Sequence, residues 1–516
     1  MDITDLLRAD AHPYPVGHLE VRETNTSWIV LTGTMAYKVK KALKLAFIDT
    51  STLERRHYLC REELRLNQRL APELYEAVVP ISLVDGGARI GSTEKIVEYA
   101  VRMRQFDAAD ELLTLLKHND VSLEDINALA RVIADFHAHA DVATATHGDA
   151  RAETLVDFVF DNTSQLRQLV ADIDASMSVD GLIGWTHDSA RALESSFRMR
   201  EQQGFIRECH GDLHAGNIVR LNRRLVPFDC LEFDPKLRFI DPINDLAFLA
   251  MDLMSQQRPD LAFALLSRYL EVSGDYEALR LLPFYAVYRA LVRAKVDALS
   301  AMQLRERRSE FLGRMLRRLH AASTWIDRKT PTLILMHGPS GSGKSWLSER
   351  LVPALSAVRV RSDVERKRLA GVADTQSATT TLPEGCHSPE FNARTYSHVT
   401  DCASHCLRAG FTTIVDAASL DAADREKIRA LAAQLSVRYL IVSCVAPPAV
   451  LAQRVACRTL ANNDASDADS AILRHQLHDF QSIAGDEARH AVCIDTQRHD
   501  AIDRVRAAYD RLQSAV

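Results

Sequence analysis

The stretch that decides the fold of the first half is HGDLHAGN, residues 210–217, followed by RLVPFD, residues 224–229. Its polar residues include Asp212, Asn217 and Asp229, whose side-chain oxygens can bind a metal. A second stretch, GPSGSGKS at residues 338–345, directly follows the apolar run TLILMH. Glycines at that spacing let backbone amides curl around phosphate groups. The chain therefore carries two phosphate-handling patterns, one in each half.

The composition of the 516 residues is that of a soluble globular protein, with 47% apolar and 26% charged residues. At roughly 150 residues per domain, this length predicts three or four folding units. A formal net charge of −6 argues against wholesale binding of nucleic acid or of anionic membranes. The opening residues lack an apolar signal segment, no apolar run approaches the roughly 18 residues of a membrane span, and the nine cysteines are dispersed. We expect a cytoplasmic protein with reduced thiols and no membrane partner.

The first hundred residues predict a small sheet with one helix. Residues 27–33 and 35–43 are β-rich runs separated by a Gly-Thr turn, which favours a hairpin. A helical pattern begins at Ser51, and two more strand-like segments follow it. We expect this α+β lobe to span residues 1–107.

Helical patterns dominate residues 108–328, except around the loop 210–217. A proline in DRKTPT then ends the last helical pattern. Beyond it, residues 329–516 alternate apolar strands with helical patterns, as a parallel sheet of βα units does. The predicted strands are 332–337, 357–362, 412–416 and 437–445. The sequence thus predicts a two-lobed α+β domain followed by an α/β domain.

The spacing around Asp212 matches a phosphoryl-transfer site. Such a site needs a carboxylate near the acceptor hydroxyl and ligands for magnesium, and Asn217 and Asp229 follow Asp212 at the expected positions. The tripeptide HGD also occurs at His147, but the residue five places after its aspartate is a threonine. The tripeptide alone is therefore weak evidence. Asp241 precedes a proline, which favours an N-cap at the start of a helix packed beneath the loop.

These pieces, HGDLHAGN, the strand end at Asp229 and DPINDLA, resemble the aminoglycoside-phosphotransferase branch of the protein-kinase-like fold. The resemblance implies that Asp212 is the catalytic base and that Asn217 and Asp229 bind Mg²⁺ beside ATP. It also implies a lysine on the third strand paired with a helix glutamate. The candidates are Lys38, with Lys40 as its rival, and Glu63, with Glu62 as its rival. Asp229 is followed by Cys-Leu instead of Phe-Gly, so the mobile metal loop of regulated kinases is not expected.

The second pattern predicts a P-loop that binds ATP. Its residues are Gly338, Pro339, Ser340, Gly341, Ser342, Gly343, Lys344 and Ser345. Lys344 would reach the β- and γ-phosphates, and the Ser345 hydroxyl would bind Mg²⁺. Two later strands end in Asp363 and Asp416, where an α/β sheet places ligand-contacting groups. Arg454 and Arg458 follow at helical spacing in LAQRVACRTL, before a polar segment.

This second half resembles the family of P-loop NTPase kinases that contains polynucleotide kinase, zeta-toxin and gluconate kinase types. The resemblance implies that Asp363 is the acceptor-hydroxyl base, that Asp416 lies near the metal, and that Arg454 and Arg458 contact the transferring phosphate. Each has a plainer interpretation: Asp363 caps a helix, and the two arginines are solvated helix charges.

The acceptors are less clearly indicated. Between Asp149 and Glu194, nine acids stand against three basic residues, which favours a cationic small molecule at the first site. Around Asp363 the balance reverses, which favours an anionic acceptor or a nucleic-acid end at the second site. The basic residues are Arg359, Arg361, Arg366, Lys367 and Arg368. Solvated surfaces explain both patterns equally well. A metal site on His398, Cys402 and Cys406, at i, i+4 and i+8, is a further hypothesis.

Taken together, these patterns predict a tandem ATP- and Mg²⁺-dependent phosphotransferase. Two alternatives remain open. In one, a regulatory protein uses one nucleotide site as a switch or pseudokinase while only the other turns over ATP. In the other, the first domain binds a partner without chemistry.

Overall fold

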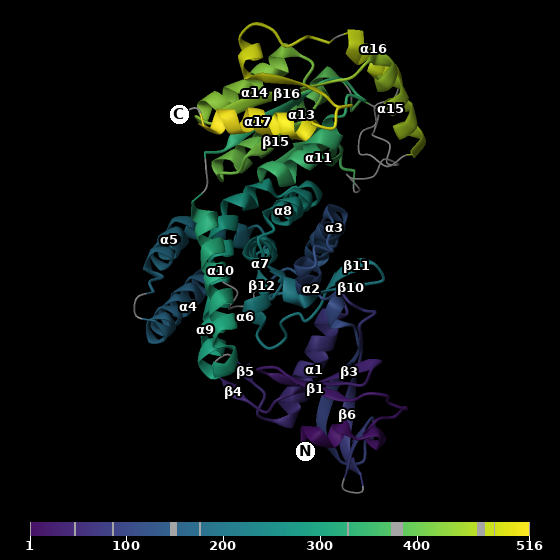
Figure 1. Ribbon diagram of the computed structural model, residues 1–516, viewed down its shortest axis with the longest axis vertical. Coiled ribbons are helices and arrows are strands. Elements are labelled where there is room, and N and C mark those ends of the chain that lie inside the picture. Colours follow the sequence, from purple (N-terminus) through teal and green to yellow (C-terminus); the bar gives the residue numbers. More distant parts are fainter. Residues whose placement is uncertain are drawn as a thin grey trace. The chain divides into compact units, whose positions relative to one another are not determined.

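The computed structural model describes most of the chain (Figure 1). The described residues are 2–45, 48–84, 87–144, 152–174, 177–327, 330–372, 385–386, 388–461, 470–478 and 480–514. Contacts divide the chain into two compact units, formed by Met1–Gln165 with Gly184–Asp252 and by Leu166–Ile183 with Leu253–Val516. The helices that directly precede the P-loop thus belong to the same unit as the C-terminal sheet. The domain limits 1–107, 108–328 and 329–516 remain a prediction.

A six-stranded antiparallel sheet begins the first unit, with the strand order β1-β2-β3-β8-β6-β7. Its strands are β1 (Glu20–Glu23), β2 (Ser27–Leu31), β3 (Met35–Lys40), β6 (Tyr75–Val84), β7 (Gly87–Ile90) and β8 (Ile96–Arg104), and β4 (Lys44–Leu45) pairs with β5 (Ile48–Asp49) nearby. Strands β2 and β3 form the expected hairpin. Helix α1 (Leu53–Asn67) packs against β6 and β8, and it begins after Thr52, whose side chain accepts a hydrogen bond from the Arg55 amide.

The remainder of the first unit positions the loop 210–217. Its short strands are β9 (Arg207–Glu208), β10 (Ile218–Leu221), β11 (Arg224–Pro227) and β12 (Phe239–Ile240), and its helices include α2 (Leu112–Lys117), α3 (Leu123–His139), α6 (Pro235–Arg238) and the start of α7 (Pro242–Ser255). The antiparallel pair β10-β11 leaves the loop and returns the chain to Asp229. The carboxylate of Asp241 accepts from the Ile243 amide at 3.1 Å, so it caps α7 as expected. Helices α4 (Ala152–Ile173) and α5 (Asp180–Gln202) each contribute residues to both units.

The second unit contains helices followed by a five-stranded parallel sheet. The helices are α8 (Pro259–Ser273), α9 (Leu282–Gln303) and α10 (Arg308–Ile326). The sheet has the order β14-β15-β13-β16-β17. Its strands are β13 (Thr332–His337), β14 (Val358–Arg361), β15 (Thr413–Asp416), β16 (Arg438–Val445) and β17 (Ala491–Asp495). Four of them lie within a residue of the predicted bounds, and β17 was not predicted.

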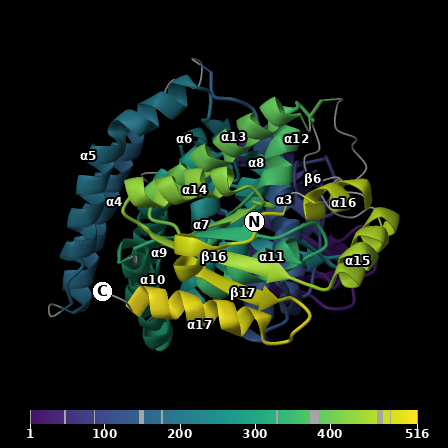
Figure 2. The same cartoon turned by 90° about the horizontal axis from the view of Figure 1, so that it is seen from above.

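Helices cover both faces of this sheet, as βα connections require. The helices of this region are α11 (Lys344–Leu355), α12 (Ser362–Leu369), α13 (Pro389–Arg408), α14 (Ala422–Gln434), α15 (Pro448–Ala461), α16 (Ser470–His478) and α17 (Ala501–Ser514). Figure 2 shows α13 and α14 on one face and α11 and α17 on the other. Strands β13, β14 and β15 are buried at every position. Among the described helices, none combines the length and apolar character needed to cross a membrane.

Candidate active sites

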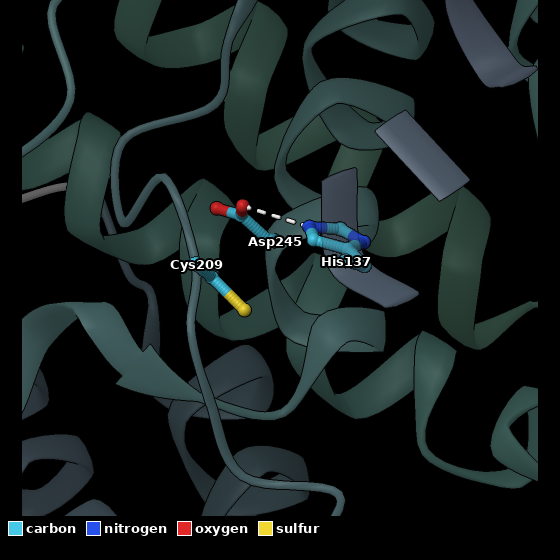
Figure 3. A group of neighbouring side chains, drawn as sticks. All are labelled: His137, Cys209 and Asp245. Atoms are coloured by element: carbon cyan, nitrogen blue, oxygen red, sulfur yellow. Dashed lines mark hydrogen bonds and ion pairs between the residues drawn. The ribbon is translucent and has the colours of Figure 1, made fainter. Parts of the chain in front are cut away.

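The carboxylate of Asp245, on α7, holds the start of the loop 210–217. It accepts hydrogen bonds from the backbone amides of His210, at 2.9 Å, and Gly211, at 3.1 Å. His137 of α3 bonds the same carboxylate through Nε2 at 3.1 Å (Figure 3). Burial would raise the pKa of Asp245, but His137 and His210 hold it below its usual value. A buried anion, Asp245, thus holds the loop, whereas Asp241 caps the start of α7.

Asp212 and Asn217 come together within the loop, as the sequence predicts. The Asn217 amide donates to the main-chain oxygen of Asp212 at 3.0 Å and to its Oδ2 at 3.1 Å. Nε2 of His214 lies 3.4 Å from the same Oδ2. The Asp212 side chain remains 36% exposed. Its carboxylate is therefore oriented on one side and accessible to an acceptor on the other.

His210 connects this loop to the strand end that carries Asp229. Its Nδ1 accepts from the Asp212 amide at 3.3 Å, so the ring proton lies on Nε2, which donates to the Phe228 carbonyl at 2.9 Å. Burial lowers the pKa of His210 and favours this neutral ring. Asp229 itself has φ of +63°, a conformation that non-glycine residues adopt uncommonly. The backbone turn at Asp229 is thus held by its surroundings.

Both candidate lysines of β3 bind Glu63. The Lys38 ammonium lies 2.8 Å from Glu63 Oε1 and 2.5 Å from Asp229 Oδ1. The Lys40 ammonium lies 2.7 Å from Glu63 Oε2 and 2.5 Å from Glu232 Oε1. Burial would raise the pKa of Glu63, but the two ammonium groups hold it well below its usual range. Of the two lysines, Lys38 is the one that contacts Asp229.

Glu62, the rival of Glu63, points to different partners. It pairs with Arg65 at 2.9 Å and with Arg238 at 3.4 Å. Both arginines also bind Glu208. The geometry therefore favours Glu63 as the partner of Lys38.

The P-loop connects β13 to α11 and borders a cavity of about 960 Å³. Gly341 and Gly343 have φ of +81° and +91°. A Cβ on Gly341 would lie 2.6 Å from the Leu451 carbonyl oxygen, so that position requires glycine for space as well as for backbone conformation. Lys344 lines the cavity, and its ammonium donates to the Pro339 carbonyl at 3.0 Å.

The other predicted residues of this second site also border the cavity, namely Ser345, Asp363, Asp416 and Arg454. Asp416 ends β15, next to β13 in the sheet, and its Oδ2 accepts from the Ser348 hydroxyl at 2.8 Å. Helix α12 begins at Ser362, so Asp363 lies inside its first turn and is not its cap. Arg454 donates to the Gly341 carbonyl at 3.2 Å. Arg458 belongs to α15, but its side chain lies outside the described residues.

The basic cluster around Asp363 does not face the cavity as a whole. Arg361 and Arg366 line it. Arg359 is buried and pairs with Glu271 at 2.7 Å, and Arg368 pairs with Glu365 at 2.9 Å. Lys367 is fully buried and is not part of the cavity lining. The charge count from the sequence therefore overstated the positive charge near an acceptor.

The acidic stretch between Asp149 and Glu194 includes surface ion pairs. Asp180 pairs with Arg167, Asp188 with Arg191 and Glu194 with Arg198. These carboxylates are between 44% and 81% exposed. That arrangement favours a solvated helix surface for these three acids. The copy of HGD at His147 lies outside the described residues.

Among the residues that the structure describes, two clusters have side chains close enough to suggest a metal. Glu365, His398 and Cys402 have ligand atoms within 4.8 Å of one another, but Glu365 Oε2 already accepts from Arg368 and His398 at 2.9 and 3.1 Å. The guanidinium supplies the positive charge that a metal would bring. Cys406, the third residue of the predicted set, is not part of the cluster.

The second cluster is His137, Cys209 and Asp245 (Figure 3). In it, Asp245 already accepts hydrogen bonds from the backbone amides of His210 and Gly211. Burial and the neighbouring Asp245 carboxylate raise the pKa of the Cys209 thiol well above its usual value. The predicted metal site on His398, Cys402 and Cys406 is not supported by the described geometry, because Cys406 lies outside the cluster and Glu365 already pairs with Arg368.

Two contacts beside the candidate sites were missed from the sequence. Glu232 lies three residues after Asp229 and binds Lys40. Ser348 lies one helical turn after Ser345 and binds Asp416. The signal for Ser348 was its i+3 spacing, which places it on the same helix face as Ser345. Glu232 carried no comparable signal, because several acids follow Asp229 closely.

Two family models match separate parts of the chain. A model described as "Phosphotransferase enzyme family" matches residues 23–282, and one described as "AAA domain" matches residues 333–483. The chain is also 29% identical, over 474 residues, to proteins of Mycobacterium tuberculosis and Mycobacterium bovis that are described as uncharacterized. The matched region covers 92% of this chain and 93% of each relative. A match of this length includes residues from both regions that the family models match.

Solved structures are similar to parts of the chain. A gluconokinase from Sinorhizobium meliloti is 22% identical, with a TM-score of 0.26, and the likeness covers 36% of this chain and 95% of that one. A choline/ethanolamine kinase family protein from Mesorhizobium loti is 13% identical, with a TM-score of 0.32, and covers 59% of this chain and 92% of that one. The two family models assign the kinase-like domain and the P-loop domain that follows it.

Proposed function

This chain belongs to the phosphotransferase enzyme family, and we propose that it is a tandem kinase whose two sites each use ATP to phosphorylate a hydroxyl acceptor. The observation that carries the proposal is that each site assembles the charged groups that phosphoryl transfer needs. Lys38 lies between Glu63 and Asp229 in the first site. Lys344 and Asp416 border one cavity in the second. Phosphoryl transfer depends chiefly on positioning and on neutralising charge.

In the first site, Asp212 would accept the proton of the acceptor hydroxyl, and Lys38 would bind the ATP phosphates. Asn217 and Asp229 would hold Mg²⁺, and they fit it because their oxygens are the hard ligands that Mg²⁺ prefers. When bound there, Mg²⁺ would neutralise part of the negative charge of the phosphates. The donated hydrogen bond from Asn217 keeps the Asp212 carboxylate oriented toward the acceptor position. The fixed loop would therefore determine where the acceptor hydroxyl must lie to give its proton to Asp212.

In the second site, the amides of the P-loop and Lys344 would bind the ATP phosphates. Ser345 and Asp416 would hold Mg²⁺ through a hydroxyl and a carboxylate oxygen, both of which suit that ion. Asp363, which lines the same cavity, would accept the proton of the acceptor hydroxyl. Arg454 and Arg458 would bind the phosphoryl group during transfer, since cationic side chains stabilise its developing charge.

Substitution of Glu63 should weaken nucleotide use at the first site. In Glu63→Gln both Lys38 and Lys40 lose their shared anion, so we expect the KM for ATP to rise about tenfold, which corresponds to about 1.4 kcal/mol. The measurement is Mg²⁺-dependent ATP turnover in a Lys344→Ala background, which removes the second site. Glu62→Gln is the matched control, because Glu62 binds Arg65 and Arg238 instead. Equal changes in the two variants would contradict the assignment of Glu63.

For the acceptors, we propose small molecules with a hydroxyl group. A cationic acceptor at the first site is a hypothesis that the paired surface acids weaken. At the second site, Arg361 and Arg366 border the cavity with Asp363, which supports an acceptor that carries an anionic group as well as a hydroxyl. A phosphorylated metabolite and a nucleic-acid end both meet that description.

Arg361→Ala with Arg366→Ala should raise the KM of the second-site acceptor about tenfold and leave ATP binding nearly unchanged. Arg366 also donates to the Cys386 carbonyl at 2.8 Å and to Asn392, so each single variant should be measured with the pair. Steady-state kinetics that vary acceptor and ATP separately provide the test. Parallel losses for acceptor and ATP would indicate general destabilisation of the cavity and not loss of an acceptor contact.

The experiment that tests the proposal is transfer of label from γ-labelled ATP to hydroxyl acceptors in the presence of Mg²⁺. The panel should contain amino sugars and amino alcohols, phosphorylated sugars and nucleosides, and an oligonucleotide with a free 5′ hydroxyl. We expect at least one acceptor class to depend on Asp212 and another on Asp363. Nucleotide binding at both sites without label transfer to any acceptor, and turnover that depends on one site alone, would favour the regulatory alternative.

A further inference from the structure

Helix α8 covers the β14 edge of the C-terminal sheet. It lies within the segment matched by the phosphotransferase family model, yet it packs against β14 and α11 of the P-loop domain (Figure 1). The Arg359 amide on β14 donates to the Ser267 hydroxyl at 3.0 Å. The Arg359 guanidinium donates through Nε to Glu271 Oε1 at 2.7 Å. One residue of β14 is therefore bound to α8 through both its backbone and its side chain.

The opposite end of the same guanidinium reaches the P-loop site. Its Nη1 donates to the Ser345 carbonyl at 3.3 Å and to the Ser348 hydroxyl at 3.1 Å. Ser348 in turn donates to Asp416 Oδ2 at 2.8 Å. The distance from Arg359 Nη1 to that Oδ2 is 3.9 Å. A chain of buried contacts thus runs from Glu271 to the two residues that we assign to Mg²⁺.

Arg359 is placed between two buried carboxylates, Glu271 and Asp416. The three residues are only 3%, 1% and 6% exposed, and charges so deeply buried are costly unless they are paired. Burial would raise the pKa of Glu271, but Arg359 and Arg268 outweigh that effect and lower it. Glu271 is therefore ionised, and it binds Arg359 more closely than Asp416 does.

We propose that Glu271 is a positioning residue of the P-loop site: it holds the Arg359 guanidinium away from Asp416 and so leaves that carboxylate free to bind Mg²⁺. The proposal rests on the kinase function proposed for this site. Without the Glu271 anion, Arg359 would turn to Asp416, the nearest remaining carboxylate, and would compete with the ion for it. Helix α8 thereby becomes part of the second active site, although it belongs to the phosphotransferase segment of the chain.

The test is the Mg²⁺ requirement of nucleotide binding in the full chain. A non-hydrolysable ATP analogue should raise the melting temperature of the chain, and only the part of this rise that Lys344→Ala abolishes is assigned to the P-loop site. The readout is the Mg²⁺ concentration at which that part reaches half of its maximum. For Glu271→Gln we expect this concentration to rise about tenfold, while binding of the analogue in EDTA changes less than twofold. Should the glutamine variant not fold, Glu271→Asp keeps the charge, shortens the reach to Arg359 and should give a smaller rise.

Two further variants separate positioning from loosening of the fold. In Glu271→Gln with Arg359→Met the competing cation is gone, so the Mg²⁺ requirement should return to within about twofold of wild type. Arg268→Met is the matched control, because Arg268 also pairs with Glu271, at 2.9 Å, and should leave the requirement unchanged.

An unaltered requirement in Glu271→Gln, or a rise that persists in the double variant, would overturn the positioning role. Absence of any Mg²⁺-dependent component in the wild type would instead overturn the proposed function of the site.

Discussion

Replacing Asp212 with asparagine should abolish phosphoryl transfer at the first site while leaving ATP bound there. The substitution keeps the size of the side chain. Its amide oxygen can still accept the hydrogen bond that Asn217 donates to Asp212 Oδ2 at 3.1 Å in the unsubstituted chain. The substitution removes the group that would accept the acceptor proton, and general bases contribute roughly 10²- to 10⁴-fold to rates. We expect a loss of about 10³-fold in first-site turnover, equivalent to about 4 kcal/mol of transition-state stabilisation.

The measurement is Mg²⁺-dependent ATP turnover at saturating ATP, with nucleotide affinity followed in parallel. Lys344→Ala is the reciprocal control, because it leaves the first site intact. If Asp212→Asn still binds ATP at the first site and turns over ATP as fast as wild type, the first site does no phosphoryl transfer of its own. The pseudokinase alternative would then be preferred for the first domain.

Local motifs made much of the two sites predictable. Within each of the motifs HGDLHAGN and GPSGSGKS the residues are close in sequence, so a short stretch of backbone sets their geometry. Asp212 and Asn217 do meet, and the P-loop does follow a buried strand and precede a helix. Asp416, at the end of β15, and Asp363, two residues after the end of β14, could also be predicted, since parallel strands bring their carboxyl ends to one edge of a sheet.

Choices that depend on partners distant in sequence were not predictable. Lys38 and Lys40 lie two residues apart on a strand, so both point to the same face, and no sequence argument separates them. The structure shows that they share Glu63 and differ in their second partners, Asp229 and Glu232. The sequence therefore suggested that one of the two lysines pairs with Glu63, whereas both of them do.

The basic residues of β14 and α12 illustrate a second limit. Arg359 and Arg361 also lie two residues apart on a strand, but only Arg361, at the strand end, reaches the cavity. Arg359 lies two residues before that strand end, where Glu271 of α8 is its partner. A count of charges near Asp363 cannot tell these positions apart, because the partner comes from another part of the chain.

Replacing Lys344 with alanine should remove ATP turnover at the second site. Lys344 begins α11 at the bottom of the P-loop, where its ammonium would leave the Pro339 carbonyl and bind the β- and γ-phosphates. Loss of one preorganised charge of this kind costs about 10²- to 10³-fold in rate. The affinity for ATP should fall as well, since the Lys344 ammonium also neutralises part of the phosphates' negative charge in the bound nucleotide before transfer.

Turnover at each site, measured with an acceptor specific to that site, provides the test, and Asp212→Asn is the reciprocal control. Because the two sites are built from separate loops and carboxylates, Lys344→Ala should leave first-site turnover within about twofold of wild type. Simultaneous loss of both activities would mean that nucleotide at the P-loop is required for the first reaction. Two independent kinases would then be excluded, and the P-loop would act as a switch for the phosphotransferase domain.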